Sequence, residues 1–317
     1  MANHCGTRPP SVAAFALCAV TACGGADIVL PPENTGLEYG GGSFAQQINV
    51  NGVARSYIVV VPASAAPAVA APLLFVYHGN GQPPEDIREQ SGLDDIAGPR
   101  GYLVVYPLGF NLRWKVLDEL DPRNLSDLDF TLEIIERIDQ DIDVDRSRIY
   151  ATGFSNGGQF THRLGCELPS TFAAIAPVGS TFTIAVRDRC DQSDPIPVTI
   201  FLGDRDGQFP WEGSIVGNDG TLSAEENLEY WVTVNGCAAA RDTSAIADLD
   251  PADGTTVSLY AHAGCSEDAD VRMFRVHDGG HTWPGSPLGG GPNAGLQTND
   301  ISASAEMVEF FDAHPLR

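Results

Sequence analysis

Short apolar runs recur along the 317-residue chain, and segments with helical spacing separate them. Pro72–Tyr77 (PLLFVY) is apolar throughout, which is typical of a strand that is buried on both faces of a sheet. Asp127–Asp139 instead has its large apolar residues at the spacing of one helix face. Strands that alternate with helices form a mostly parallel sheet with helices on both faces. The sequence therefore predicts an α/β fold with three layers.

The other expected elements continue this alternation. Asn49–Val61 is expected to form a hairpin that turns at Asn51-Gly52, and only this beginning of the sheet is expected to be antiparallel. The other expected strands are Tyr102–Tyr106, Arg148–Thr152, Phe172–Pro177, Val198–Gly203, Thr256–Ala261 and Val271–Val276. The other expected helices are Pro84–Ile96, Ser155–Cys166, Ala224–Val234 and Ser302–Phe311.

The first 22 residues have the composition of a secretory signal. They hold one arginine, a short apolar stretch and no acidic side chain. They lead into Val20-Thr21-Ala22-Cys23, which resembles the bacterial lipobox, in which the cysteine is acylated and becomes the first mature residue. We expect a lipoprotein signal peptide over 1–22, a lipid on Cys23, a tether over 23–42 and a single domain over 43–317. Ordinary cleavage nearby is the alternative. Either reading predicts an exported protein, in the cell envelope or outside the cell.

Four cysteines remain once the signal and the lipid-bearing cysteine are set aside. An even number in an exported chain favours disulfides, and four cysteines allow three pairings. We expect the pairing of nearest neighbours in the sequence, Cys166–Cys190 and Cys237–Cys265. A zinc site is the alternative, but the sequence has no C-x₂-C spacing. No metal or other cofactor is expected.

The charge balance is strongly acidic, with 42 Asp and Glu against 18 Lys and Arg and a net charge of −24. This charge repels phosphate backbones and argues against a nucleic-acid partner. A solvated surface explains it most simply, while steering of a cationic substrate and adaptation to salt are alternatives. A membrane partner is expected only through the N-terminal lipid, and nothing in the sequence indicates an oligomeric state.

A candidate nucleophile stands between an expected strand and an expected helix. Gly153-Phe154-Ser155-Asn156-Gly157 matches G-x-S-x-G, the motif in which a serine occupies a sharp strand-to-helix turn. Glycines two residues before and after the serine let the backbone pass without a Cβ clash. The helix N-terminus adds partial positive charge where an oxyanion would form. Ser155 is therefore the expected nucleophile.

The expected oxyanion donors come from two turns. His78-Gly79-Asn80-Gly81 directly follows the buried strand, where such folds place one backbone N–H, and the residue after the nucleophile supplies the other. We assign the N–H groups of Asn80 and Asn156. A plain tight turn is the alternative for the first of them.

In this type of fold, the acid and the base follow the serine in that order. Val198–Gly203 leads into Asp204-Arg205-Asp206, and Asp206 is expected to be the acid because it lies far enough into the loop to turn back. Asp204 is the alternative and is expected to cap its own turn. Val271–Val276 leads to His281, the expected base, beyond a Gly-Gly pair. His277 is nearer the strand and is expected to be structural.

These motifs resemble those of secreted esterases related to polyhydroxybutyrate depolymerases and feruloyl esterases, in the α/β-hydrolase superfamily. The similarity covers nearly the whole mature chain, in PLLFVYHGNGQ, RIYATGFSNGGQF, AAIAPVG, GDRD, NGC and HDGGHTWPG. It implies the α/β-hydrolase fold, places Ser155, Asp206 and His281 on catalytic positions, and fits the cysteine pattern. Two departures are Asn80, where the group commonly has cysteine, and Gly207–Trp211, where it usually has a Val-Pro stretch.

The resemblance implies a serine esterase that forms an acyl-enzyme and needs no cofactor. Trp211, Trp283 and His78 are the expected substrate-binding residues, and the two tryptophans would form an aromatic wall. Packing of the loop bases is the alternative for both indoles. The expected substrates are short-chain or aromatic acyl esters, such as hydroxyalkanoate oligomers and feruloyl or acetyl sugar esters, with crystalline polyester less favoured. Gln208–Thr221 and Pro284–Gly295 are candidate lids. A serine peptidase and a non-catalytic surface lipoprotein are the alternatives.

Overall fold

A computed structural model describes residues 36–116, 126–190, 194–214, 220–291 and 293–316. The expected signal peptide, Cys23 and the tether as far as residue 35 lie outside the described residues. Within the range expected to be a tether, Leu37 is 7% exposed and packs in the core, and its backbone N–H donates to Asp141 at 2.7 Å. The packed chain therefore begins before residue 43.

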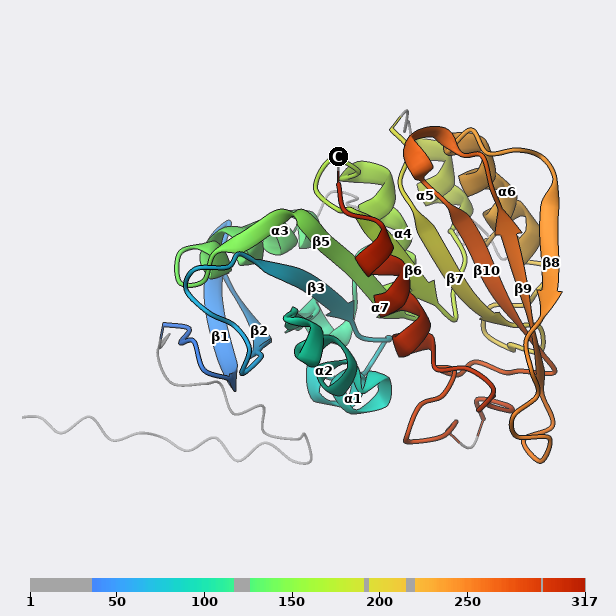
Figure 1. Cartoon of the computed structure of the whole chain (residues 1–317), viewed down its shortest axis with the longest axis horizontal. Coiled ribbons are helices and arrows are strands. Elements are labelled where there is room, and N and C mark those ends of the chain that lie inside the picture. The colour runs from blue at the N-terminus through green and yellow to red at the C-terminus, as the bar shows by residue number, and fades with distance from the viewer. Residues whose placement is uncertain (1–35, 117–125, 191–193, 215–219, 292, 317) are drawn as a thin grey trace, which may run out of the picture. The chain divides into compact units, whose positions relative to one another are not determined.

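The described chain forms a twisted ten-stranded sheet in the order β1-β2-β4-β3-β5-β6-β7-β10-β9-β8 (Figure 1). The strands are β1 (Gly42–Val50), β2 (Val53–Val61), β3 (Ala71–Tyr77), β4 (Leu103–Pro107), β5 (Val144–Phe154), β6 (Ala174–Val178), β7 (Val198–Gly203), β8 (Arg241–Ala245), β9 (Thr256–His262) and β10 (Val271–His277). The six strands from β4 to β10 in this order are parallel to one another. The expectation of a mostly parallel α/β fold is confirmed.

The expectation that only the beginning of the sheet is antiparallel was wrong. β9 pairs antiparallel with β10, and β8 pairs antiparallel with β9, so both edges of the sheet are antiparallel. β8 was missed because every residue of its sequence, RDTSA, is exposed and no apolar residue alternates along it. The strand conformation of β8 comes from its pairing with β9, and this pairing cannot be predicted from the local sequence of β8.

Two layers of helices cover the sheet (Figure 1). One face carries α1 (Pro84–Ser91), α2 (Leu93–Ala97) and α7 (Ala303–Ala313), and its core includes Ile87, Leu93 and Phe311. The other face carries α3 (Asp127–Asp139), α4 (Asn156–Glu167), α5 (Ile184–Arg189) and α6 (Ala224–Val234), and its core includes Phe130, Phe160 and Trp231. The described residues also include the short 3₁₀ turns η1 (Gly98–Arg100), η2 (Phe110–Leu112) and η4 (Ser266–Asp268). The three-layer arrangement is the expected one.

The helix expected over Pro84–Ile96 is two helices. Gly92 ends α1 with φ 59° and ψ 22°, and α2 starts at the next residue. This left-handed conformation suits glycine and interrupts the helical hydrogen bonds. The break turns the chain, so α1 and α2 run in different directions over the same face of the sheet (Figure 1).

Both expected disulfides are present. Cys166, near the end of α4, is bonded to Cys190 at the end of α5, and Cys237, after α6, is bonded to Cys265, after β9. Each bond closes a loop that the unfolded chain would otherwise keep open, which is stabilising in the chain-entropy model.

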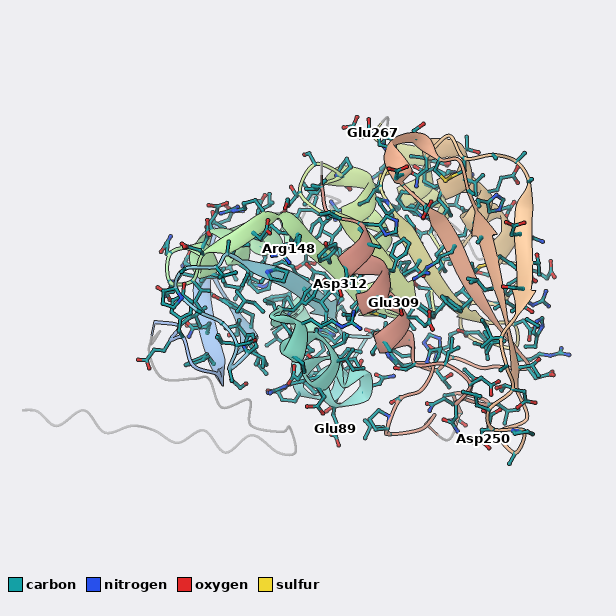
Figure 2. The ribbon with its side chains drawn as sticks, in the orientation of Figure 1. Glu89, Arg148, Asp250, Glu267, Glu309 and Asp312 are labelled. Carbon is teal, nitrogen blue, oxygen red and sulfur yellow. A yellow bond between two sulfur atoms is a disulfide. The ribbon has the colours of Figure 1, made fainter. Side chains whose placement is uncertain are left out.

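Acidic side chains are exposed on several separate elements. Figure 2 labels Glu89 on α1, Glu267 after β9 and Glu309 on α7, all of which are exposed. This distribution agrees with the simplest explanation of the net charge, a solvated surface. None of the helices in the described ranges is both long and apolar enough to cross a bilayer.

Candidate active site

Ser155 occupies a strained turn between β5 and α4. Its φ of 55° and ψ of −118° lie outside the regions that L-residues usually adopt. A Cβ on Gly153 would lie 2.5 Å from the carbonyl oxygen of Gly157, and a Cβ on Gly157 would lie 2.2 Å from the carbonyl oxygen of Tyr77. Both glycines are therefore required for the turn, and the serine is held at the start of the helix. Strain of this kind at a single residue is typical of functional sites.

Asp206 lies in the turn that follows β7 and is 3% exposed. Its Oδ1 accepts hydrogen bonds from the backbone N–H of Gln208 at 2.7 Å and of Phe209 at 2.9 Å. Its Oδ2 lies 2.7 Å from Nδ1 of His281. The turn therefore fixes the carboxylate in one orientation and leaves the second oxygen for the histidine.

His281 comes from the loop after β10 and is 6% exposed. Its ring packs against two phenylalanines, with centroid distances of 4.6 Å to Phe154 and 5.8 Å to Phe209. Its backbone N–H donates to the carbonyl of Ala294, which ties the loop to the following segment. The imidazole is thus held by its ring faces as well as by the hydrogen bond to Asp206.

Asp204, the alternative acid, and His277, the other histidine after β10, lie close to each other and apart from His281. Asp204 Oδ2 accepts from the Arg275 guanidinium at 2.8 Å, and Nδ1 of His277 lies 3.4 Å from the same oxygen. Nε2 of His277 lies 2.8 Å from the Ser258 hydroxyl. Ser258, His277 and Asp204 thus form a second set of the same three residue types. However, Ser258 belongs to strand β9 rather than to a strand-to-helix turn.

Ser155 and His281 open into one cavity of about 310 Å³. The cavity is lined by Gly79, Asn80, Gln82, Gln90, Phe154, Ser155, Gln208, His281, Thr282, Gly289, Gly290, Gly291 and Ala294. In the part of the chain that the structure describes, no hydrogen bond joins the Ser155 hydroxyl to the imidazole; the two side chains meet as lining residues of this cavity. Such a looser contact is common in a substrate-free site and tightens in the complex.

The two expected oxyanion donors stand beside the nucleophile. Asn156 is the first residue of α4, so its N–H is among the helix N-terminal groups that lack an intrahelical partner. Asn80 is exposed at the cavity, and the preceding Gly79 is so close to Ser155 that a Cβ there would lie 3.6 Å from the serine Cβ. The N–H of Gly79 donates to Gln82 Oε1 at 2.9 Å and the N–H of Gly81 donates to the carbonyl of Leu112 at 2.8 Å, so the N–H groups on both sides of Asn80 are already bonded within the protein.

None of the three expected substrate-binding residues lines this cavity. Trp283 is 1% exposed, and its indole N–H donates to the Ser304 hydroxyl at 3.0 Å. Trp211 lines a separate hollow, with the Arg275 guanidinium 4.4 Å from its ring centre. These positions favour the alternative, that the two indoles pack the bases of their loops.

His78 is fully buried and holds the backbone of the turn 78–81, which is the expected oxyanion turn. Its Nε2 accepts from the N–H of Gly109 at 2.9 Å, and its Nδ1 lies 2.8 Å from the carbonyl of Gly79. Burial lowers the pKa of His78 to about 4, so the ring is neutral at neutral pH. Nδ1 then carries the proton, because Nε2 must accept.

The lining residues that the sequence did not indicate include two carboxamides, Gln82 and Gln90. Gln82, Gln90 and Gln208 face the cavity beside Asn80, and Phe154 adds an aromatic ring. Gln82 ends the HGNGQ motif, so its position in that motif was an available signal; Gln90 lies on α1 and carries none. Of the candidate lids, Gln208, residues 289–291 and Ala294 line the cavity, while 215–219 and residue 292 lie outside the described residues.

Within the described ranges, no group of three or more His, Cys, Asp or Glu side chains is arranged to hold a metal ion. The four cysteines that could have been ligands form disulfides. The arrangement of serine, histidine and carboxylate instead suits nucleophilic attack on a carbonyl carbon.

Several known proteins that are similar to this chain are named esterases. No protein-family model matches the chain. NocK of Nocardia uniformis subsp. tsuyamanensis, which is provisionally named an esterase, is 29% identical over 282 residues, covering 84% of this chain and 81% of NocK. Feruloyl esterase C of Emericella nidulans is 29% identical over 251 residues, covering 76% of this chain and 80% of that protein. Feruloyl esterase B of Piromyces equi is 27% identical over 236 residues, and the alignment spans 42% of its length.

Among solved structures, the acetyl xylan esterase from Aspergillus awamori has the same fold. The TM-score is 0.53 at 16% sequence identity, and the match covers 75% of this chain and 94% of that enzyme. At this identity the similarity concerns the fold alone, which is the expected α/β-hydrolase fold.

Proposed function

We propose that this chain, a serine carboxylic-ester hydrolase of the feruloyl esterase group, works through a catalytic triad of Ser155, His281 and Asp206. The observation that carries the proposal is the buried 2.7 Å hydrogen bond between His281 Nδ1 and Asp206 Oδ2, beside a cavity that Ser155 also lines. The strained turn at Ser155 supports it independently.

In the proposed reaction, His281 Nε2 takes the proton of the Ser155 hydroxyl while the oxygen attacks the ester carbonyl carbon. Asp206 keeps the proton of the imidazole on Nδ1 and stabilises the imidazolium that forms. The N–H groups of Asn80 and Asn156 bind the oxyanion. The carbon–oxygen bond to the alcohol then breaks, and His281 gives its proton to the leaving oxygen. Water attacks the acyl-enzyme by the same route, and the carboxylic acid leaves.

The proposed substrates are esters with a short or aromatic acyl group and a polar alcohol. Carboxamides of Asn80, Gln82, Gln90 and Gln208 line the cavity, and they can bind hydroxyl and carbonyl groups beside the ester. Phe154 and the His281 ring supply the aromatic surface. Acetyl and feruloyl sugar esters and hydroxyalkanoate oligomers combine these features, and the name of the Emericella nidulans relative supports the feruloyl esters.

We also propose that the protein is exported and anchored by a lipid on Cys23. The two disulfides support export, since such bonds persist in oxidising compartments. Mass spectrometry of the mature N-terminus tests the anchor: diacylglycerol on Cys23 supports it, and an unmodified N-terminus elsewhere contradicts it.

Two matched serine variants test the triad. Ser155→Ala should lower kcat for p-nitrophenyl acetate by about 10⁶-fold, the scale found when a triad serine is removed. Ser258→Ala breaks a serine–histidine hydrogen bond of 2.8 Å outside the cavity and should leave kcat unchanged. Retention of turnover by Ser155→Ala would end the proposal. A panel of acetyl, butyryl, feruloyl and hydroxybutyrate esters on the wild type then ranks the substrates.

A further inference from the structure

We propose that Asn156 has a second role, through its side chain: it joins the bridging segment, Gly109–Lys115, in fixing the distance between the two oxyanion donors. This inference rests on the proposed function, which assigns those donors to the N–H groups of Asn80 and Asn156. The two groups come from separate elements, the turn after β3 and the start of α4. One substrate oxygen can accept hydrogen bonds from both N–H groups only if each nitrogen lies about 2.7–3.1 Å from that oxygen. The distance between the two nitrogens must therefore be fixed.

The bridging segment is bound to the start of α4 by the Asn156 carboxamide. Oδ1 of Asn156 accepts from the N–H of Trp114 at 2.7 Å, and Nδ2 donates to the carbonyl of Trp114 at 3.2 Å. Two turns further along α4, the Arg163 guanidinium donates to the carbonyl of Lys115 at 3.0 Å. Asn156 is 9% exposed and Trp114 is 3% exposed, so water does not compete freely for these bonds.

The same segment is bound to the oxyanion turn by three hydrogen bonds. The Trp114 indole N–H donates to the carbonyl of His78 at 2.9 Å, and the N–H of Gly109 donates to Nε2 of His78 at 2.9 Å. The N–H of Gly81 donates to the carbonyl of Leu112 at 2.8 Å. These bonds flank Asn80 on both sides, so they set the direction of its peptide group.

The conformation of the segment itself is tight. Asn111 and Leu112 have φ values of 52° and 57°, and a Cβ on Gly109 would lie 2.6 Å from the carbonyl oxygen of Arg113. The Trp114 ring packs 5.0 Å from Tyr77, on β3, and 5.4 Å from Phe160, on α4, between ring centres. A strained and packed segment that holds two elements together acts as a rigid spacer. Asn156 is in this sense a positioning residue as well as a donor.

The test removes the carboxamide and keeps the backbone donor. Asn156→Ala should lower kcat by about 10- to 100-fold, below the loss for a missing donor, with KM changed by less than about threefold. The inhibition constant of an alkyl trifluoromethyl ketone, which adds to a serine as an oxyanion, should rise by the same factor as kcat falls. A purely structural role would lower the melting temperature without this matched change.

Asn235→Ala is the control, because Asn235 makes the same kind of clamp away from the cavity. Its Oδ1 accepts from the N–H of Ile196 at 3.1 Å, and its Nδ2 donates to the carbonyl of Ile196 at 2.6 Å. This variant should lose thermal stability and keep the kcat and the inhibition constant of the wild type. If Asn156→Ala does not fold, Trp114→Phe replaces it, since phenylalanine keeps one aromatic ring and loses the pyrrole ring with the N–H bonded to His78. The same matched change is expected.

Wild-type kcat in Asn156→Ala, or a lower kcat with an unchanged inhibition constant, would overturn the inference. If Ser155→Ala is inactive in the same assay, either of these Asn156→Ala outcomes removes only the role of the Asn156 side chain and leaves the proposed triad standing. If Ser155→Ala is active, the proposed function fails first.

Discussion

Replacing Gly157 with alanine perturbs the point where β3 and α4 meet below the nucleophile. The new Cβ would lie 2.2 Å from the carbonyl oxygen of Tyr77 and 2.6 Å from that of His78. Both are backbone atoms, so rotation of a side chain cannot relieve the contact. To restore a separation of about 3.0 Å, the start of the helix must move by about 0.8 Å relative to the end of β3.

This movement carries the Ser155 hydroxyl and the Asn156 N–H away from the oxyanion turn. A misplacement of about 1 Å can cost roughly 10²-fold in rate, so kcat should fall by about this factor. Overpacking should also lower the free energy of unfolding by roughly 1–3 kcal/mol. The higher helix propensity of alanine returns up to about 1 kcal/mol of this loss.

Gly165→Ala is the matched control because it lies on the same helix, far from the nucleophile. Its Cβ would lie 2.5 Å from Cδ1 of Ile175, the end of a flexible side chain. We expect lower stability and unchanged kcat. Hydrolysis of p-nitrophenyl acetate gives kcat, and thermal unfolding gives stability. The reasoning is refuted if Gly157→Ala keeps the kcat of the wild type, or if both variants lose activity equally.

Three further changes have defined outcomes. Asp206→Asn places an amide against the imidazole and favours the wrong tautomer, so kcat should fall by about 10⁴-fold in the same assay; an unchanged kcat would contradict the role of the acid. Replacing both Cys237 and Cys265 with alanine opens a loop of sequence separation 28 and should lower the free energy of unfolding, measured in urea, by roughly 3 kcal/mol. A double variant as stable as the wild type would contradict this. Burial lowers the pKa of His78 from 6.5 to about 4, and it lowers the pKa of His162, a buried residue of α4, from 6.5 to about 3. Below pH 6.5 these histidines therefore bind protons in the unfolded chain but not in the folded chain. The stability they contribute is complete above pH 6.5, and the free energy of unfolding should fall by about 1.4 kcal/mol per pH unit for each histidine down to pH 4; equal urea midpoints at pH 7 and pH 5 would argue against this.

The sheet and the candidate triad were predictable because their signals are local. A buried parallel strand such as Pro72–Tyr77 is apolar throughout, and G-x-S-x-G between a strand and a helix has few other uses. The carboxyl ends of parallel strands meet at one edge of the sheet, which brings the turns holding Ser155, Asp206 and His281 together. The structure pairs Asp206, rather than Asp204, with His281 at 2.7 Å.

The rest depends on contacts between distant segments. The exposed strand β8 has no apolar pattern, and its conformation follows from its partner. Trp283 precedes a proline-containing loop, like a residue at a pocket rim, but its indole turns inward to Ser304. The bridging segment was missed because its bonds to His78 and Asn156 join residues 31 to 42 positions apart. Neither composition nor periodicity reports such contacts.

Covalent labelling with a fluorophosphonate tests most directly whether Ser155 is the activated serine. The probe reacts with a serine whose hydroxyl is deprotonated by a neighbouring base and whose oxyanion is bound, and peptide mass spectrometry locates the adduct. We expect a single adduct on the peptide that contains Ser155, lost in Ser155→Ala and strongly slowed in His281→Ala. An adduct on Ser258, or labelling of Ser155 at the wild-type rate without His281, would contradict the triad.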